Sequence, residues 1–254
     1  MVQVHIEADA TALAAAAARL GAEAIRSAVA TRGAANVVVA TGASQFETLA
    51  ALVREPGIDW ARVTGFHLDE YVAFPETHPA SFRRYLKERF TSQLPMLGAF
   101  HFIKGDAADL NAEMARLGAL IARHPIDVTF AGIGENAHLA FNDPPADFET
   151  AKPFHVVTLE ERCRRQQFNE GWFPALADVP HKAVTMSVPE IMRSGLIVLA
   201  VPDCRKAEAV RDTLEGPITP MVPASIMRRH GACHLFLDPA SAALLQNAAT
   251  ASKA

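Results

Sequence analysis

The sequence predicts an α/β fold in which helices flank both faces of an open, mostly parallel sheet. Short runs of apolar and β-branched residues recur, and each is followed by glycine, proline or a polar residue and then by a helical pattern. This alternation is typical of parallel strands joined by crossover helices. Half of the 254 residues are apolar, and no repeat or linker divides the chain. We therefore expect one Rossmann-like domain spanning residues 1–254.

The predicted elements follow one another in strand and helix order. Strands are expected where the apolar runs are richest in β-branched or aromatic residues, at 37–40, 63–68, 126–131, 196–201 and 233–237. Helices are expected before, between and after them, at 9–31, 44–54, 79–90, 107–123, 204–214 and 239–246. The first helix is rich in alanine, the strongest helix former, and the third carries Pro79 in its first turn. Pro144, Pro145 and Pro153 predict a loop from Asn142 to Phe154.

Composition limits the partners of this chain. A net charge of −4 leaves no basic excess for a nucleic-acid backbone, and no apolar stretch approaches the roughly 20 residues that span a bilayer. Cys163, Cys204 and Cys233 are too few and too far apart for a disulfide framework or a CxxC metal site, which favours a reducing cytoplasm. Small molecules, or further copies of the chain in a homo-oligomer, are the expected partners.

The first candidate site segment lies between a predicted strand and a helix. Thr41, Gly42, Ala43 and Ser44 follow the strand at 37–40. Ligands of open α/β sheets bind beyond the carboxyl ends of strands, and a helix N-terminus there favours an anion such as phosphate. An ordinary turn with Ser44 as the helix N-cap is the alternative.

The second segment places Asp69 and Glu70 at the end of the strand at 63–68. A carboxylate at this edge of the sheet can act as a general base if its neighbours hold it near a reacting carbon. An aspartate that caps a turn or a helix is the alternative.

The third segment, 132–144, crowds Gly134, Asn136, His138 and Asp143 into a dozen residues after a strand. A histidine changes protonation near neutral pH, and Asp143 is placed to orient it, as acid/base catalysis requires. A structural histidine is the alternative. The GxG pattern lacks the third glycine of a dinucleotide fingerprint, which excludes a nicotinamide cofactor.

The fourth segment brings Lys206 to the start of a helix after the strand at 196–201, where it can pair with a phosphate. A solvated surface lysine is the alternative. His67, Asp69 and His138 could together hold a metal, but their spacing is not diagnostic. We expect neither a metal nor an organic cofactor.

Read in order, these segments resemble the glucosamine-6-phosphate deaminase family, which is related to the 6-phosphogluconolactonases. The matching segments are LDEYV with HPASF after it, GIGENAHLAFNDP, the strand followed by Lys206, and MVPASI. The similarity runs from about Val37 to Leu237. HLAFNDP resembles the deaminases more than the lactonases.

The resemblance implies a role for each of these residues. Asp69 would move a proton between C2 and C1 of the open-chain sugar, and His138 would open the pyranose ring. Asp143 stands where the family usually has a glutamate, and Asn136 where it has aspartate or asparagine. Ala137 replaces a glycine, so its backbone must avoid positive φ or accept strain.

The resemblance also implies how the substrate is bound, without a metal or an organic cofactor. Residues 41–44 and Lys206 would bind phosphate, with Glu70 and Gly134 as further substrate contacts. A family arginine has Arg164 or Arg165 as its candidate, although charged residues in a helix commonly form its solvated face. The alternatives are a galactosamine-6-phosphate isomerase, a 6-phosphogluconolactonase, and a non-catalytic sugar-phosphate sensor.

Overall fold

The computed structural model describes residues 2–246 and contains two sheets. The main sheet is parallel throughout, in the order β1-β10-β9-β6-β2-β3-β5. Its strands are β1 (Gln3–Ile6), β2 (Ala35–Val39), β3 (Val63–His67), β5 (Ala99–His101), β6 (Val128–Ala131), β9 (Leu196–Val201) and β10 (Cys233–Leu237). The second sheet is antiparallel, in the order β4-β8-β7, with β4 (Asp69–Tyr71), β7 (Phe154–Thr158) and β8 (Lys182–Met186).

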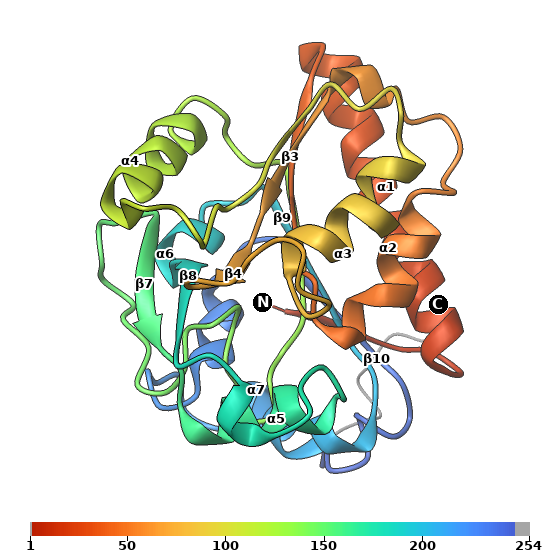
Figure 1. Cartoon of the computed structure of the whole chain (residues 1–254). Helices are drawn as coiled ribbons and strands as arrows, with labels where there is room; N and C mark the ends of the chain where they lie inside the picture. Colours follow the sequence, from red (N-terminus) through yellow and green to blue (C-terminus); the bar gives the residue numbers. More distant parts are fainter. Residues whose placement is uncertain (1, 247–254) are drawn as a thin grey trace.

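Helices cover both faces of the main sheet, as the sequence predicts. The α-helices are α1 (Ala10–Arg32), α2 (Phe46–Leu52), α3 (Phe82–Arg89), α4 (Leu110–Ile121), α5 (Glu161–Asn169), α6 (Val188–Ile191) and α7 (Ala207–Glu215). Short 3-10 helices are η1 (Ala43–Gln45), η2 (Trp60–Arg62), η3 (Thr91–Gln93), η4 (Leu176–Asp178), η5 (Cys204–Lys206) and η6 (Pro223–Arg229). In Figure 1, α1, α2 and α3 lie on one side of the main sheet, and α4 and α6 lie on the other. No helix among the described residues is long and apolar enough to cross a bilayer.

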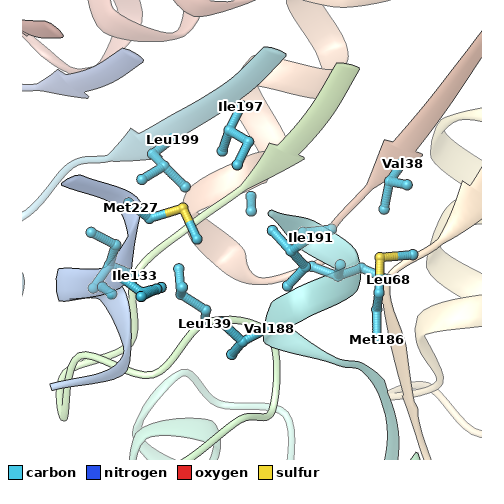
Figure 2. Packing of buried hydrophobic residues seen from close by; sticks show 14 of the residues in the cluster. Val38, Leu68, Ile133, Leu139, Met186, Val188, Ile191, Ile197, Leu199 and Met227 are labelled. Carbon is cyan, nitrogen blue, oxygen red and sulfur yellow. The ribbon is translucent and has the colours of Figure 1, made fainter. Parts of the chain in front are cut away.

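The alternation of side chains along each strand divides the core in two. Val37 and Val39 pack against α1 and α2, whereas Val38 between them faces the opposite layer. Figure 2 shows this second layer, in which Leu199 of β9 lies beside Met227, and Leu139 lies beside Val188 of α6. Because β9 is covered on both faces, its six residues are all apolar rather than alternating with polar residues.

Local signals explain where the helices begin and end. The Asp9 carboxylate accepts the Ala12 N–H at 2.8 Å, and Gly33, in the left-handed region at φ 78°, ends α1. The predicted start of the third helix at Pro79 is wrong, because Ser81 caps α3 and Pro79 lies in the preceding turn.

The predicted helix at 239–246 is also wrong, because this segment forms successive turns. The Asp238 carboxylate accepts the Ser241 N–H at 2.7 Å, and the Ser241 hydroxyl accepts the Asp238 N–H at 3.2 Å. Such local side-chain bonds compete with helical ones. The predicted loop from 142 to 154 is confirmed up to the start of β7.

Candidate active site

A cavity with about 490 Å³ of empty space opens beyond the carboxyl ends of four neighbouring strands, β9, β6, β2 and β3. Segments after each strand line it, namely Lys206, Gly132 to Gly134, Gly42 to Gln45, and Asp69. From β2 the chain continues to β3, which is the neighbour of β2 on one side, whereas the next strand to join the sheet beside β2 is β6, on its other side. The cavity therefore lies at the point where the strand order reverses. Ligand sites of open α/β sheets form at such points.

The segment after β2 lies against the segment after β6. Gly42, Ala43 and Ser44 line the cavity, while the buried Thr41 does not. A Cβ atom built on Gly132 would lie 2.8 Å from Ser44 Oγ, so a larger residue there would require the Ser44 side chain to shift. Ser44 caps neither η1 nor α2, and the alternative in which it is the N-cap is therefore wrong.

Asp69 begins β4 and carries its carboxyl group into the cavity while remaining only 6 % exposed. Burial, and then the charge of Glu70, raise the pKa of Asp69 to about 8. A carboxyl group with this pKa gains the basicity that proton abstraction near neutral pH requires. The side chain therefore has the electrostatics of a general base.

Glu70 is not brought to the cavity with Asp69. Its carboxylate accepts the Arg83 N–H at 2.8 Å and the Ser81 hydroxyl at 3.0 Å. The Arg83 guanidinium lies 3.6 Å away and also contacts Asp106 at 2.8 Å. Glu70 thus fixes the start of α3, and its placement does not support the predicted substrate contact.

His138 lines the cavity and is held from behind by Asp143. Its Nδ1 atom lies 3.1 Å from Asp143 Oδ1. The Asn136 amide donates to the same oxygen at 2.9 Å, and its own Oδ1 accepts the His138 N–H at 3.2 Å. Burial alone would raise the pKa of Asp143, but His138, Asn136 and the Glu160 N–H together lower it. Asp143 therefore stays ionised beside the histidine.

Two neighbours of His138 have unusual requirements. A Cβ atom on Gly134 would lie 2.2 to 2.3 Å from three atoms of the His138 ring, so only glycine leaves the ring its position. Ala137 has a φ of 63°, so its backbone does not avoid positive φ but accepts the strain of the left-handed conformation.

Lys206 ends η5 and lines the cavity, although it is only 5 % exposed. Burial lowers its pKa, against the opposing charges of Glu170 and Glu135. Within the described part of the chain, no carboxylate comes within the 4.0 Å of an ion pair. The surface alternative is wrong, and the ammonium group is available to an anion.

One side of the cavity is formed by residues that were not predicted from the sequence. Gln166, Gln167 and Glu170 of α5 and its C-terminus line it. Gln166 Nε2 donates to Glu170 Oε1 at 2.8 Å, and Tyr71 donates to Gln167 Oε1 at 2.9 Å. The i, i+4 spacing of Gln166 and Glu170 was a signal for one helix face, but no motif marked it.

The two candidate arginines lie elsewhere. Arg164 donates to the backbone carbonyls of Leu176 and Val179 at 2.8 and 2.9 Å, and neither it nor Arg165 lines the cavity. Arg165 pairs with Glu161 on the surface.

A different set of side chains from the one considered in the sequence has the composition of a metal site. His67 is fully buried and does not join Asp69 and His138. Instead, among the described residues, ligand atoms of His138, Asp143 and Cys163 lie within 4.8 Å of one another. Burial, and then Asp143, raise the pKa of the Cys163 thiol well above its usual value.

Comparison with known proteins gives one consistent result. The family model for glucosamine-6-phosphate isomerases and 6-phosphogluconolactonase matches residues 8–235. A glucosamine-6-phosphate deaminase of Exiguobacterium sibiricum is 38 % identical over 196 residues, which cover 77 % of this chain and 76 % of that protein. Another, from Streptococcus pyogenes serotype M1, is 34 % identical and covers 84 % and 89 %.

Solved structures agree with these relatives. The structure of a monomeric glucosamine-6-phosphate deaminase superposes with a TM-score of 0.85 at 32 % identity, covering 96 % of this chain and all of that one. A putative 6-phosphogluconolactonase from Neisseria gonorrhoeae has a TM-score of 0.74 at 20 % identity, over 94 % of this chain and 100 % of its own. The latter shows the common fold alone.

Proposed function

The chain belongs to the family of glucosamine-6-phosphate isomerases and 6-phosphogluconolactonases, and on that basis we propose that it deaminates an amino-sugar 6-phosphate. Its reaction converts glucosamine 6-phosphate and water into fructose 6-phosphate and ammonia. The main support for the proposal is that Asp69, whose pKa is raised, lines the same cavity as His138 and Lys206.

Substrate binding is assigned to the two segments that favour anions. Lys206 supplies a buried positive charge, and residues 42–44 offer backbone at the edge of the sheet. A charge-assisted contact to a phosphate is worth about 1.5 to 3 kcal/mol. The proposed site takes its charge from Lys206, because no arginine of the described chain lines the cavity.

Ring opening is assigned to His138, whose imidazole delivers a proton to the ring oxygen. The Asp143 carboxylate lies 3.1 Å from Nδ1, on the side of the ring that faces away from the substrate. Asn136 and Gly134 act through the histidine, the first by hydrogen bonds and the second by leaving space for the ring.

Proton transfer between carbons is assigned to Asp69. Its carboxylate takes the C2 proton of the open-chain aldehyde to give an enolamine, and the proton is returned at C1. The C2 iminium that results adds water and releases ammonia, leaving the ketose. A carboxylate of ordinary pKa is too weak a base for this carbon acid, so the raised pKa of Asp69 is the feature that suits the step.

The deaminase assignment is favoured over a lactonase by identity of 34 to 38 % to deaminases, against 20 % to the lactonase structure. Asp69 and His138 together disfavour a sugar-phosphate sensor, which needs neither a base nor an acid. Three free cysteines fit a cytoplasmic enzyme, which we include in the proposal.

A panel assay tests the proposal. Ammonia release is measured with glucosamine 6-phosphate, galactosamine 6-phosphate and unphosphorylated glucosamine, and hydrolysis is followed with 6-phosphogluconolactone. We expect ammonia from a phosphorylated amino sugar alone, and the better of the two identifies the preferred C4 configuration. Lactone hydrolysis without ammonia release, or binding without turnover, would contradict the proposal.

A further inference from the structure

The back of the His138 ring meets three different ligand types. His138 Nδ1, Asp143 Oδ1 and Cys163 Sγ offer nitrogen, oxygen and sulfur, and the cluster fits within 4.8 Å. A tetrahedral ion with bonds of about 2.0 to 2.3 Å sets its ligands roughly 3.3 to 3.8 Å apart. The 3.1 Å between Nδ1 and Oδ1 is already close to that spacing.

The nitrogen of this cluster lacks a well-directed partner. His138 is 7 % exposed, and its Nδ1 makes no hydrogen bond of acceptable geometry even though Asp143 is near. Such a buried polar atom is costly unless something else satisfies it. A cation between the two side chains would satisfy this nitrogen.

Asp143 also borders a space outside the substrate cavity. A second cavity, with about 860 Å³ of empty space, is lined by Asp143, Asp147 and Glu160 together with His155. Three carboxylates around one opening concentrate cations there. Asp143 therefore belongs both to the cluster and to the lining of this acidic cavity.

We propose that His138, Asp143 and Cys163 form an inhibitory site for a thiophilic divalent cation such as Zn²⁺. The three side chains supply three ligands, and water takes the fourth position. The thiol proton, and any proton on Nδ1, leave to solvent as the ion binds. Nδ1 and Asp143 are then engaged by the metal, so His138 no longer cycles its proton. The inhibition rests on the proposed function, whereas the binding does not.

The first test is direct binding of Co²⁺ to the full chain. We expect one Co²⁺ per chain by calorimetry, with the d–d absorption of four-coordinate cobalt and a thiolate charge-transfer band. Cys163→Ala removes a ligand and should weaken binding by at least about 100-fold and abolish the band, since even losing an outer-shell partner costs 10- to 100-fold. Cys204→Ala is the matched control, because Cys204 is exposed and outside the cluster.

A second variant tests the site without relying on the Cys163→Ala protein, which could fail to fold. The double variant Cys204→Ala, Cys233→Ala leaves Cys163 as the chain's one cysteine. A thiolate band in that protein must come from Cys163, and its absence overturns the site. Unchanged affinity in Cys163→Ala would overturn it as well.

The third test is inhibition. Zn²⁺ should stop ammonia release by the wild-type enzyme and a chelator should restore it, while Cys163→Ala keeps its basal activity and resists Zn²⁺. Equal inhibition of both proteins would show that the ion acts elsewhere. A Co²⁺ band in a protein without deaminase activity would refute the proposed function and leave the metal site standing.

Discussion

One added methyl group at Gly134 tests the proposed acid without removing it. A Cβ atom there would lie 2.2 Å from His138 Cε1 and 2.3 Å from both ring nitrogens. Carbon contacts in proteins lie near 3.5 to 4.0 Å, so the ring in Gly134→Ala must move by more than about 1 Å. That movement opens the 3.1 Å contact between Nδ1 and Asp143.

The size of the effect follows from this displacement. A misplacement of about 1 Å at a catalytic group costs about 100-fold in rate, which corresponds to about 2.7 kcal/mol. Overpacking should also lower the free energy of unfolding by about 1 to 3 kcal/mol. We expect Gly134→Ala to reduce kcat/KM for ammonia release about 100-fold. Gly231→Ala is the control, because its Cβ would meet nothing within 4 Å.

A double-mutant cycle separates the ring clash from a general disturbance of the loop. In a His138→Ala background the new methyl group has no ring to meet, so the loss of stability caused by Gly134→Ala should disappear. Thermal unfolding of the four proteins measures this coupling. Near-wild-type turnover by Gly134→Ala, or a stability loss that persists without the ring, would refute the reasoning.

Three further substitutions test the other assignments. Asp69→Asn should abolish turnover. The difference in stability between this variant and the wild type should shift in favour of the variant between pH 4 and about 8, because the carboxyl group binds its proton more tightly in the native state than in the unfolded state. Turnover that survives, or a stability difference that stays constant in thermal melts across this range, would contradict the assignment. Lys206→Met should weaken binding of phosphorylated sugars by about 10- to 100-fold, and equal loss for unphosphorylated glucosamine would exclude a phosphate contact. Wild-type kcat/KM should rise toward pH 8, and Glu70→Gln should move that limb to lower pH by removing a neighbouring negative charge; an unmoved pH profile would count against the coupling.

The buried strands could be predicted because their sequences are apolar on both faces. The runs at 37–40 and 196–201 correspond to β2 and β9, which lie inside the main sheet. β1 was missed because its four residues are partly exposed and pair with β10 at the other end of the chain. The second sheet was missed for a similar reason, since β4 has three residues and its partner β8 lies more than 100 residues away.

Site residues could be predicted from the sequence where their position after a parallel strand places them at the cavity. They could not be predicted where the direction of the side chain determines whether it reaches the cavity. Asp69, His138 and Lys206 all follow strands, and the ends of parallel strands meet at one edge. Glu70 is adjacent to Asp69, but successive side chains of a strand point to opposite faces, and the sequence did not say which faces the cavity. The direction of Arg164 was equally hidden, because it depends on carbonyl groups of a loop 12 to 15 residues away.

Ala137 shows how this chain positions His138 with a left-handed residue other than glycine. A left-handed alanine costs about 1 to 2 kcal/mol. Its buried methyl group returns about 0.8 kcal/mol, and an alanine also restricts the unfolded chain by about 0.4 to 1 kcal/mol relative to glycine. These terms nearly cancel, so the substitution is close to neutral for stability. The Ala137 N–H bonds to Gly134 and its carbonyl to Ala224, both at 2.9 Å, which holds the strained turn from two sides. The chain therefore gains a stiffer loop beside its proposed acid at little net cost.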